Sequence, residues 1–259
     1  MKKQTVLFAS LLLVFVFAIS AAQAGWYCPV CGQENDDNFC PKDGTSRPNG
    51  DGGSFSAGDL LKLGRYEQNN KFTDGAEEIE WYILDVQGNK ALLLSKYSLD
   101  QKPYETEHRE TAWENSWIRE WLNETFYHQA FTEDDQAIIL ESEVKNGADQ
   151  SLYHVDGGND TLDYIFLLSG KEYEQYVSDD EAEEGEKYEY GGCTYYACGL
   201  TEEDEYTYEA GYWLRSPGED RSMASDIDWD GTPSCFEVNA EEVSVRPCMW
   251  IDLGKYAER

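Results

Sequence analysis

The chain has 259 residues, of which 52 are acidic and 20 are lysine or arginine, so its formal net charge is −32. A chain this acidic repels nucleic acid and anionic membrane surfaces, which excludes both as partners, whereas cations, basic proteins and neutral glycans stay compatible. Aromatic residues make up 14% of the sequence, which is enough for a packed core, so the chain is not predicted to be globally disordered.

Residues 1–24 predict a secretory signal peptide. Lys2 and Lys3 form a short basic region, and residues 6–19 are an apolar run shorter than the roughly 20 residues that span a bilayer. Residues 22–24, Ala-Gln-Ala, give a small-x-small cleavage site. A retained N-terminal anchor is the alternative. Cleavage would leave a secreted, extracytoplasmic protein that does not insert into a membrane.

Residues 25–45 predict a small module held together by a metal. Cys28 and Cys31 form one knuckle, and Cys40 and Asp43 repeat its shape with proline and glycine in equivalent places. Three thiolates and one carboxylate can hold a structural zinc ion in a closed tetrahedral site. The stretch resembles the short zinc-ribbon modules of bacterial proteins. A disulfide from Cys28 to Cys31 or Cys40 is the alternative, because a secreted protein can meet an oxidising compartment.

Residues 46–56 are rich in glycine and serine and predict a flexible linker to a main domain at residues 57–255. Within that domain, residues 80–86 and 90–95 are apolar runs that predict two strands. The sequence Gln-Gly-Asn at residues 87–89 predicts a hairpin turn between them.

Two helices are predicted next. Trp117 and Trp121 recur at helical spacing in an apolar stripe, and Asn115 is expected to cap this first helix. Thr132 is expected to cap a second helix, with Asp135 three residues on as a capping box. Further on, a short buried strand is predicted at residues 163–169 and a helix at residues 170–177.

Residues 179–209 are dominated by acidic residues and tyrosines and predict a solvated excursion from the domain. Cys193 and Cys198 lie five residues apart and could form a local disulfide that pins it. Between them, Tyr195 and Tyr196 combine apolar area with a polar tip, which is typical of interaction surfaces. The alternative is a loop that only increases solubility.

The C-terminal region predicts a β-meander. A turn is expected at Asp230 and Gly231, where the chain reverses between two of its strands. The predicted strands are residues 212–216, 224–229, 235–238 and 243–253.

Residues 226–237 also match the calcium-loop pattern of an EF-hand. The matching positions are Asp226, Asp228, Asp230 and Glu237. An EF-hand loop lies between helices, whereas strands are predicted on both sides here. Strand alternation would place the three aspartates on an exposed face, with Ile227 and Trp229 toward the core. Because three carboxylates on one face repel one another, a calcium ion could still bind there.

Arg215 and Arg246 each lie in an otherwise apolar predicted strand of a very acidic chain. A buried arginine needs a carboxylate partner, so structural pairing is the favoured interpretation for both. The alternative is ligand contact. On that alternative, Trp213 and Arg215 would bind a ligand together with Tyr195 and Tyr196.

The C-terminal pattern resembles a secreted bacterial domain of unknown function, numbered 6273. It reads W-L-R-S-P-G at residues 213–218 and V-R-P-x-x-W-I at residues 245–251. The resemblance covers residues 59–253 and includes upstream stretches such as LGRYEQ and IEWYILDV. The same layout is similar to the C-type-lectin-like fold of sulfatase-modifying-factor domains. It implies an α+β, C-type-lectin-like domain of mixed and antiparallel strands with two or three helices, preceded by the zinc-ribbon-like knuckle.

An enzyme on such a fold would need an arranged set of reactive groups. His108, His128 and His154 are scattered, and Cys235 and Cys248 match no pattern for cysteine chemistry. Whether these two cysteines are joined to each other stays open. The sequence therefore favours a secreted, non-catalytic binding module for an extracellular glycan or surface protein. The alternatives are an enzyme on a sulfatase-modifying-factor-like fold and a purely architectural surface protein.

Overall fold

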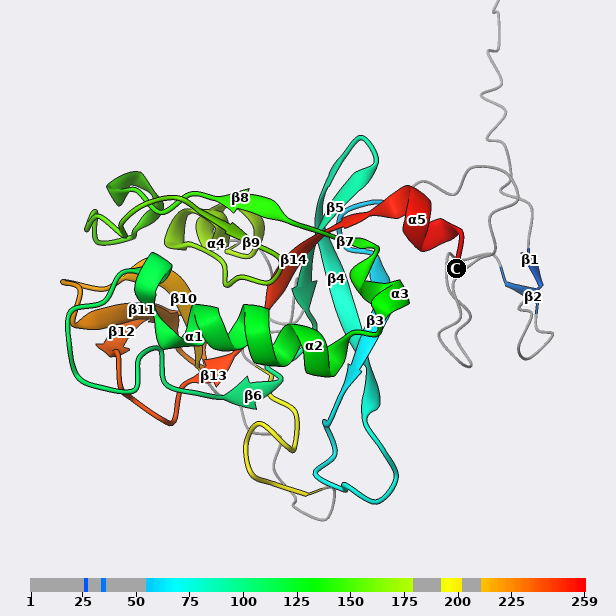
Figure 1. Ribbon diagram of the computed structural model, residues 1–259, viewed down its shortest axis with the longest axis horizontal. Coiled ribbons are helices and arrows are strands. Elements are labelled where there is room, and N and C mark those ends of the chain that lie inside the picture. Colours follow the sequence, from blue (N-terminus) through cyan, green and yellow to red (C-terminus); the bar gives the residue numbers. More distant parts are fainter. Residues whose placement is uncertain (1–25, 28–33, 36–54, 179–191, 202–210) are drawn as a thin grey trace, which may run out of the picture. The chain divides into compact units, whose positions relative to one another are not determined.

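Figure 1 shows the computed structural model, which describes residues 26–27, 34–35, 55–178, 192–201 and 211–259. The chain divides into two units, residues 1–53 and residues 54–259. In the first unit, β1 (Trp26–Tyr27) pairs antiparallel with β2 (Glu34–Asn35). The predicted signal peptide, most of the predicted linker, and Cys28, Cys31, Cys40 and Asp43 lie outside the described residues. No helix of the described part is long and apolar enough to cross a membrane.

The first sheet of the second unit has five strands, and all of its neighbouring strands are antiparallel. In sheet order they are β3 (Leu60–Tyr66), β4 (Glu77–Gln87), β5 (Lys90–Ser95), β14 (Cys248–Asp252) and β7 (Ile139–Leu140). The two predicted strands are confirmed as parts of β4 and β5. Their hairpin turns at Gly88, whose φ of 62° is a left-handed conformation that glycine adopts without strain.

The second sheet also has five strands and carries the predicted meander. In sheet order they are β12 (Pro233–Glu237), β11 (Met223–Ile227), β10 (Tyr212–Pro217), β13 (Ser244–Val245) and β6 (Asp100–Gln101). Only the β10–β13 pair is parallel. β10 is buried along its whole length, whereas β12 is the exposed edge of the sheet.

The single strand predicted at residues 243–253 is wrong, because the chain changes sheets within it. β13 belongs to the second sheet and β14 to the first. The break falls at Arg246 and Pro247, where proline has no backbone N–H to continue a ladder. The carbonyl of Pro247 instead accepts from the N–H of Ser95 on the first sheet at 3.0 Å. This crossing ties the two sheets together.

The first predicted helix is confirmed, but its cap is Ser116 rather than Asn115. The Oγ of Ser116 accepts from the N–H of Arg119 at 3.4 Å, whereas Asn115 ends a short 3₁₀ turn, η1 (Trp113–Asn115). Figure 1 shows α1 and α2 as parts of one continuous helix. Its consecutive segments are α1 (Trp117–Glu120), the π-helical η2 (Trp121–Phe126) and α2 (Tyr127–Ala130).

The other helices are short. In α3 (Glu133–Gln136), the predicted capping box of Thr132 and Asp135 is present. α4 (Gly170–Tyr176) matches its prediction and starts from a second capping box at Ser169. The strand predicted at residues 163–169 is wrong, because β9 (Thr161–Asp163) ends where it should begin. The remaining elements are β8 (Ser142–Val144), which pairs with β9, η3 (Ala148–Gln150) and α5 (Leu253–Ala257).

The two sheets and the helices share one core, which places the second unit in the α+β class. The long helix buries Ile118, Leu122 and Phe126. Phe126 lies 5.1 Å from the Tyr66 ring of β3, centroid to centroid. The helix face opposite this packing is left to solvent, and it carries the groove described next.

A polar groove beside the π-helical segment

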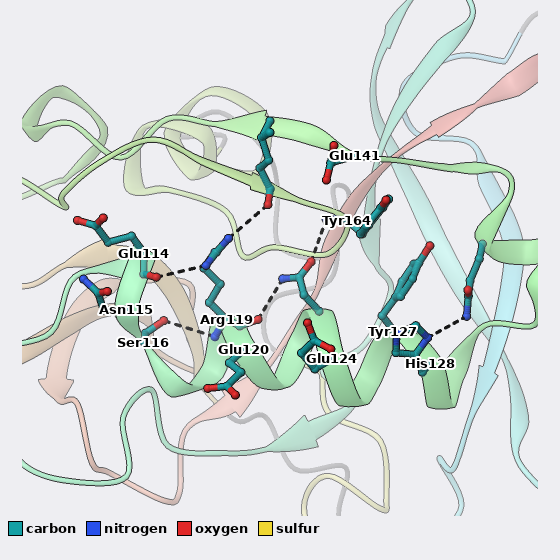
Figure 2. A pocket seen from close by; sticks show the side chains of 13 residues that line it. Glu114, Asn115, Ser116, Arg119, Glu120, Glu124, Tyr127, His128, Glu141 and Tyr164 are labelled. Carbon is teal, nitrogen blue, oxygen red and sulfur yellow. Dashed lines mark hydrogen bonds between the residues drawn. The ribbon is translucent and has the colours of Figure 1, made fainter.

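A groove of about 790 Å³ runs along the solvent side of the long helix, as Figure 2 shows. One wall comes from the helix and the residues just before it, and the other comes from β9, the residue after it and Glu141. The lining residues are Glu114, Asn115, Ser116, Arg119, Glu120, Asn123, Glu124, Tyr127, His128, Gln136, Glu141, Leu162 and Tyr164.

Asn123 joins the two walls. Its Nδ2 donates to the carbonyl of Ile165 at 2.9 Å, and its Oδ1 accepts from the N–H groups of Tyr164 and Ile165 at 2.9 and 3.1 Å. The same Nδ2 donates to the carbonyl of Arg119 at 3.0 Å. Asn123 belongs to the π-helical η2, so the irregular helix and the floor of the groove share one residue.

Arg119 is the only lysine or arginine among the lining residues, and its charge is already compensated. Its Nε lies 2.6 Å from Oδ1 of Asp163, and its two Nη atoms donate to the carbonyls of Glu114 and Leu162. Asp163 is buried and also accepts from Trp113 Nε1 at 3.0 Å and Thr161 Oγ1 at 2.6 Å. This network fixes the groove wall, and the guanidinium is occupied by it.

Two stacked tyrosines form the aromatic part of the groove. The rings of Tyr127 and Tyr164 are 4.9 Å apart between centroids and inclined by only 15°. Burial, and then Tyr164, raises the pKa of Tyr127, so its hydroxyl stays protonated at neutral pH. Tyr164 is half-buried and therefore keeps part of its ring open to solvent.

The rest of the lining consists mainly of hydrogen-bonding groups. The exposed Glu120, Glu124 and Glu141 have no ion-pair partner within the described part of the chain. Hydrogen bonds from the Asn159 side chain and backbone lower the pKa of Glu114. Ser116 Oγ donates to the carbonyl of Trp113 at 3.0 Å and caps the helix, so its hydroxyl is committed to structure. The groove is thus a negatively charged, acceptor-rich surface beside an aromatic pair.

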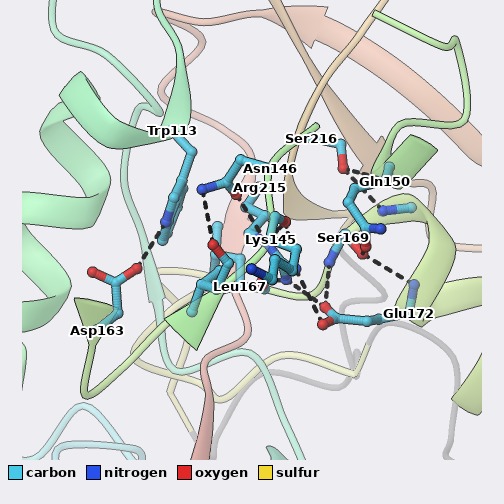
Figure 3. Close-up of polar contacts among 12 residues, drawn as sticks. Trp113, Lys145, Asn146, Gln150, Asp163, Leu167, Ser169, Glu172, Arg215 and Ser216 are labelled. Atoms are coloured by element: carbon cyan, nitrogen blue, oxygen red, sulfur yellow. Dashed lines mark hydrogen bonds and ion pairs between the residues drawn. The ribbon is translucent and has the colours of Figure 1, made fainter. Parts of the chain in front are cut away.

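Trp213 and Arg215, two candidate ligand contacts, lie inside the core. Trp213 is fully buried, and its Nε1 donates to the carbonyl of Lys102 at 2.9 Å. Arg215 is 1% exposed and forms a bidentate ion pair with Glu172, with Nη2 at 3.1 Å from Oε1 (Figure 3). Burial alone would raise the pKa of Glu172, but Arg215 and Ser169 lower it further than burial raises it. Arg215 is therefore paired with a carboxylate inside the core, which is the favoured interpretation from the sequence.

Arg246 is buried too, but it has no carboxylate partner within the described residues, so the expected pairing is wrong there. Its Nε and Nη2 donate to the carbonyls of Ser95 and Lys96 at 2.9 and 3.0 Å. Its guanidinium carbon lies 5.2 Å from the centroid of the Tyr212 ring. Backbone carbonyls and an aromatic face replace the carboxylate at the point where the chain crosses between sheets.

The EF-hand-like positions do not share an exposed face, so the predicted alternation is wrong. Asp226 is 1% exposed, and Trp229, predicted to face the core, is 57% exposed. Asp226 is buried because β11 lies between β10 and β12 and residues 224–227 are all buried, so the strand has no exposed face there. Trp229 is exposed because β11 ends at Ile227 and a turn follows, closed by a 2.8 Å bond from the N–H of Asp228 to the carbonyl of Thr232. Burial, and then Asp228, raises the pKa of Asp226 to about 7.

No group of three or more acidic, histidine or cysteine side chains in the described ranges lies close enough to hold a metal ion. Calcium at Asp226, Asp228, Asp230 and Glu237 therefore stays a prediction. Zinc at the N-terminal cysteines also stays a prediction, because its expected ligands are outside the described ranges.

Cys193 and Cys198 form a disulfide with Cα atoms 6.3 Å apart. Beside it, the Tyr196 ring packs against the exposed Phe72 at 5.9 Å between centroids. Tyr195 is half-buried in the same turn. These residues lie outside the groove, so the candidate tyrosines belong to a second surface.

Cys235 and Cys248 are unpaired and lie in different sheets. Burial raises the pKa of the Cys248 thiol, which keeps it protonated in the core.

The groove residues Arg119, Asn123, Tyr127 and Tyr164 were not among the predicted site residues. One available signal was Asn123, a polar residue with low helix propensity in the middle of an apolar helical stripe. The pairing of the helix with β9 and Tyr164 depends on contacts more than 40 residues apart in sequence, such as that of Asn123 with Ile165. Periodicity within one helix does not report such contacts.

A family model described as "Domain of unknown function (DUF6273)" matches residues 88–253. Both walls of the groove and the whole second sheet lie within this match. No curated protein and no solved structure matches the chain.

Proposed function

This chain belongs to the DUF6273 family, whose description names no activity, and from its groove we propose that it is a secreted, non-catalytic binding module. Its ligand is an uncharged extracellular glycan, which binds along the solvent side of the long helix. The observation that carries the proposal is the stacked Tyr127–Tyr164 pair set in a wall of carboxylates and amides.

The lining chemistry suits a polyhydroxylated ligand. Sugar hydroxyls can donate to the oxygens of Glu120, Glu124 and Glu141 and to Oε1 of Gln136, whose Nε2 is bound to the Phe131 carbonyl. They can exchange hydrogen bonds with the amide of Asn115. Tyr164 adds a flat, partly open apolar surface with a polar tip, against which the C–H face of a sugar ring can pack. The groove volume is within the range of typical ligand sites.

Charge narrows the glycan class. The one arginine of the described lining is bound to Asp163 and the lining contains no lysine, so neither residue type is free there to bind a carboxylate or sulfate on the ligand. The free glutamates and the net charge of −32 repel such groups. Neutral glycans are therefore preferred over uronic or sulfated ones.

A glycan array with the purified full chain tests this proposal. We expect signal on neutral glycans, and we expect Tyr164→Ala to lose it. Tyr195→Ala is the matched control, because this tyrosine is outside the groove and should leave the signal unchanged. Loss of signal in the Tyr195 variant alone would move the site to the disulfide turn, and an array with no neutral hits would reject the proposal.

We further propose that the main domain has a C-type-lectin-like fold and that the protein is exported. The C-terminal meander and two curled sheets are compatible with a C-type-lectin-like domain over residues 57–255. The signal-peptide pattern of residues 1–24 supports export, after which the module would meet glycans outside the cell. Direct sequencing of the N-terminus of the exported protein tests this, with residue 25 expected first.

We also propose two metal sites, each of which is independent of glycan binding. A structural zinc ion bound by Cys28, Cys31, Cys40 and Asp43 would stabilise the N-terminal module, which is too small for a core of its own. A calcium ion near Asp226 and Asp228 would relieve the repulsion between their carboxylates. Calorimetry with calcium on wild type and Asp228→Ala tests the second claim, and equal heats in both would reject it.

A further inference from the structure

The edges of the two sheets are treated differently by the rest of the chain. β3 is the long edge of the first sheet, and a side chain covers the outward backbone groups of Lys62. The hydroxyl of Tyr256 lies 3.3 Å from both the N–H and the carbonyl of Lys62. Such cover prevents another chain from pairing with this edge.

β12, the edge of the second sheet, has no such cover among the described residues. The N–H of Val238 bonds the carbonyl of Ser222, and the N–H of Asp228 bonds that of Thr232. With the observed register, these bonds turn the backbone of Ser234 and Phe236 toward β11. The N–H groups of Cys235 and Glu237 and the carbonyls of Pro233 and Cys235 therefore point outward.

Apolar and acidic side chains surround this open edge. Phe236 is 40% exposed and Trp229, in the turn that leads into β12, is 57% exposed. Both are large hydrophobic side chains that solvent contact does not favour. Glu237 lies at one end of the strand, and Asp228 and Asp230 lie in the turn at the other.

We propose that β12 pairs with an extended, basic peptide segment of a partner protein, which adds a sixth strand to the second sheet. The outward backbone groups would supply four hydrogen bonds, and alternate side chains of the partner would reach Phe236 and the acidic ends. A second copy of this chain fits the edge poorly, because both copies carry a net charge of −32. The proposal concerns a surface separate from the groove and does not depend on glycan binding.

The test uses the full chain and a short peptide in which lysine and valine alternate, with a glutamate–valine peptide of equal length for comparison. We expect the basic peptide only to bind, with an affinity that added salt weakens. Tryptophan fluorescence should report this binding in the wild type and not in Trp229→Phe, a comparison that is needed because the chain has 8 tryptophans. Glu237→Pro removes the outward N–H without touching the bonds to β11, and it should weaken binding about tenfold. Glu237→Gln keeps the N–H and loses the charge, so it should weaken binding by about twofold.

Amide exchange in the wild type provides a readout that needs no variant. Addition of the basic peptide should slow exchange at Cys235 and Glu237, whose N–H groups face outward, and should leave Phe236 unchanged. Equal binding of both peptides, or identical affinities for the proline and glutamine variants, would overturn the proposal. A dimer in sedimentation that Glu237→Pro abolishes would overturn it as well, in favour of a second copy.

Discussion

The side chain of Asn123 contacts the backbone of Ile165 twice, donating to its carbonyl at 2.9 Å and accepting from its N–H at 3.1 Å. Through this residue the π-helical segment holds the wall that carries Tyr164. Asn123 thus joins the π-helical segment to the opposite wall of the groove, so changes at Asn123 should affect stability and binding together.

Asn123→Ala should lower the free energy of unfolding by about 2–4 kcal/mol, because the backbone groups of Tyr164, Ile165 and Arg119 lose their partner. Urea denaturation measures this change. Asn115→Ala is the matched control, since Asn115 is exposed and caps no helix, and it should change stability by less than about 0.5 kcal/mol. Equal losses in the two variants would contradict the role assigned to Asn123.

Breaking the Arg215–Glu172 pair should be strongly destabilising. Arg215→Met leaves Glu172 without its cation and should cost about 3 kcal/mol or more, measured by thermal or urea unfolding. The double variant with Glu172→Leu should recover part of this loss, because no unpaired charge remains. Full recovery is not expected, since the carbonyls of Leu167 and Lys145 also lose a donor. A strictly additive double variant would show that the two residues are not coupled.

Asp226 should make the folded state less stable as pH rises. Its pKa is about 7 in the fold and 3.8 without it, so the folded state favours the neutral acid. The penalty is absent below pH 4, grows between pH 4 and 7 and is constant above pH 7; it is on the order of 4 kcal/mol at 1.36 kcal/mol per pKa unit.

Asp226→Asn should therefore stabilise the protein at pH 8 and leave its stability at pH 4 nearly unchanged, as measured by urea unfolding with a chelator present. Asp230→Asn is the matched control. Asp230 is exposed, and hydrogen bonds from Thr232 lower its pKa, so this variant should not gain stability at pH 8. If the free energy of unfolding depends on pH in the same way in wild type and in Asp226→Asn between pH 4 and 8, the penalty assigned to buried Asp226 is contradicted.

Zinc in the N-terminal module should be measurable by elemental analysis as one ion per chain. Asp43→Ala should reduce the zinc content, because the fourth ligand is lost, and Asp51→Ala in the linker should not. Unchanged stoichiometry in Asp43→Ala would remove this residue as a ligand. A native mass that shows no bound metal and lacks the two hydrogens that a disulfide removes would favour the Cys28 disulfide instead.

Local rules predicted a good part of the fold. The β4–β5 hairpin, the capping box at Thr132 and the helix that starts at Gly170 each depend on residues close in sequence, so their patterns were visible. The change of sheet at Arg246 and Pro247 was not visible, because it depends on which distant strands flank the segment. The burial of Asp226 was not visible either, because alternation assumes one exposed face, whereas residues 224–227 of β11 are all buried between β10 and β12.

The candidate site was harder to predict than the fold. Trp213 and Arg215 are conspicuous in the sequence, yet an aromatic and a charged residue in a central strand serve the core equally well. The groove residues are inconspicuous because helical periodicity reports only the buried stripe, whereas Tyr127 and Tyr164 meet across two elements. Binding surfaces formed between elements need the tertiary contacts that a single sequence does not contain.

We propose that the groove beside Tyr164 binds a neutral glycan. The most direct measurement is amide and side-chain NMR of the labelled full chain during titration with a neutral glycan selected on the array. We predict that the largest shifts occur at Tyr127, Tyr164 and the Asn123 side-chain amide, with a matching loss in Tyr164→Ala. Shifts confined to Phe72, Tyr195 and Tyr196, or no shifts with any array hit, would contradict the account.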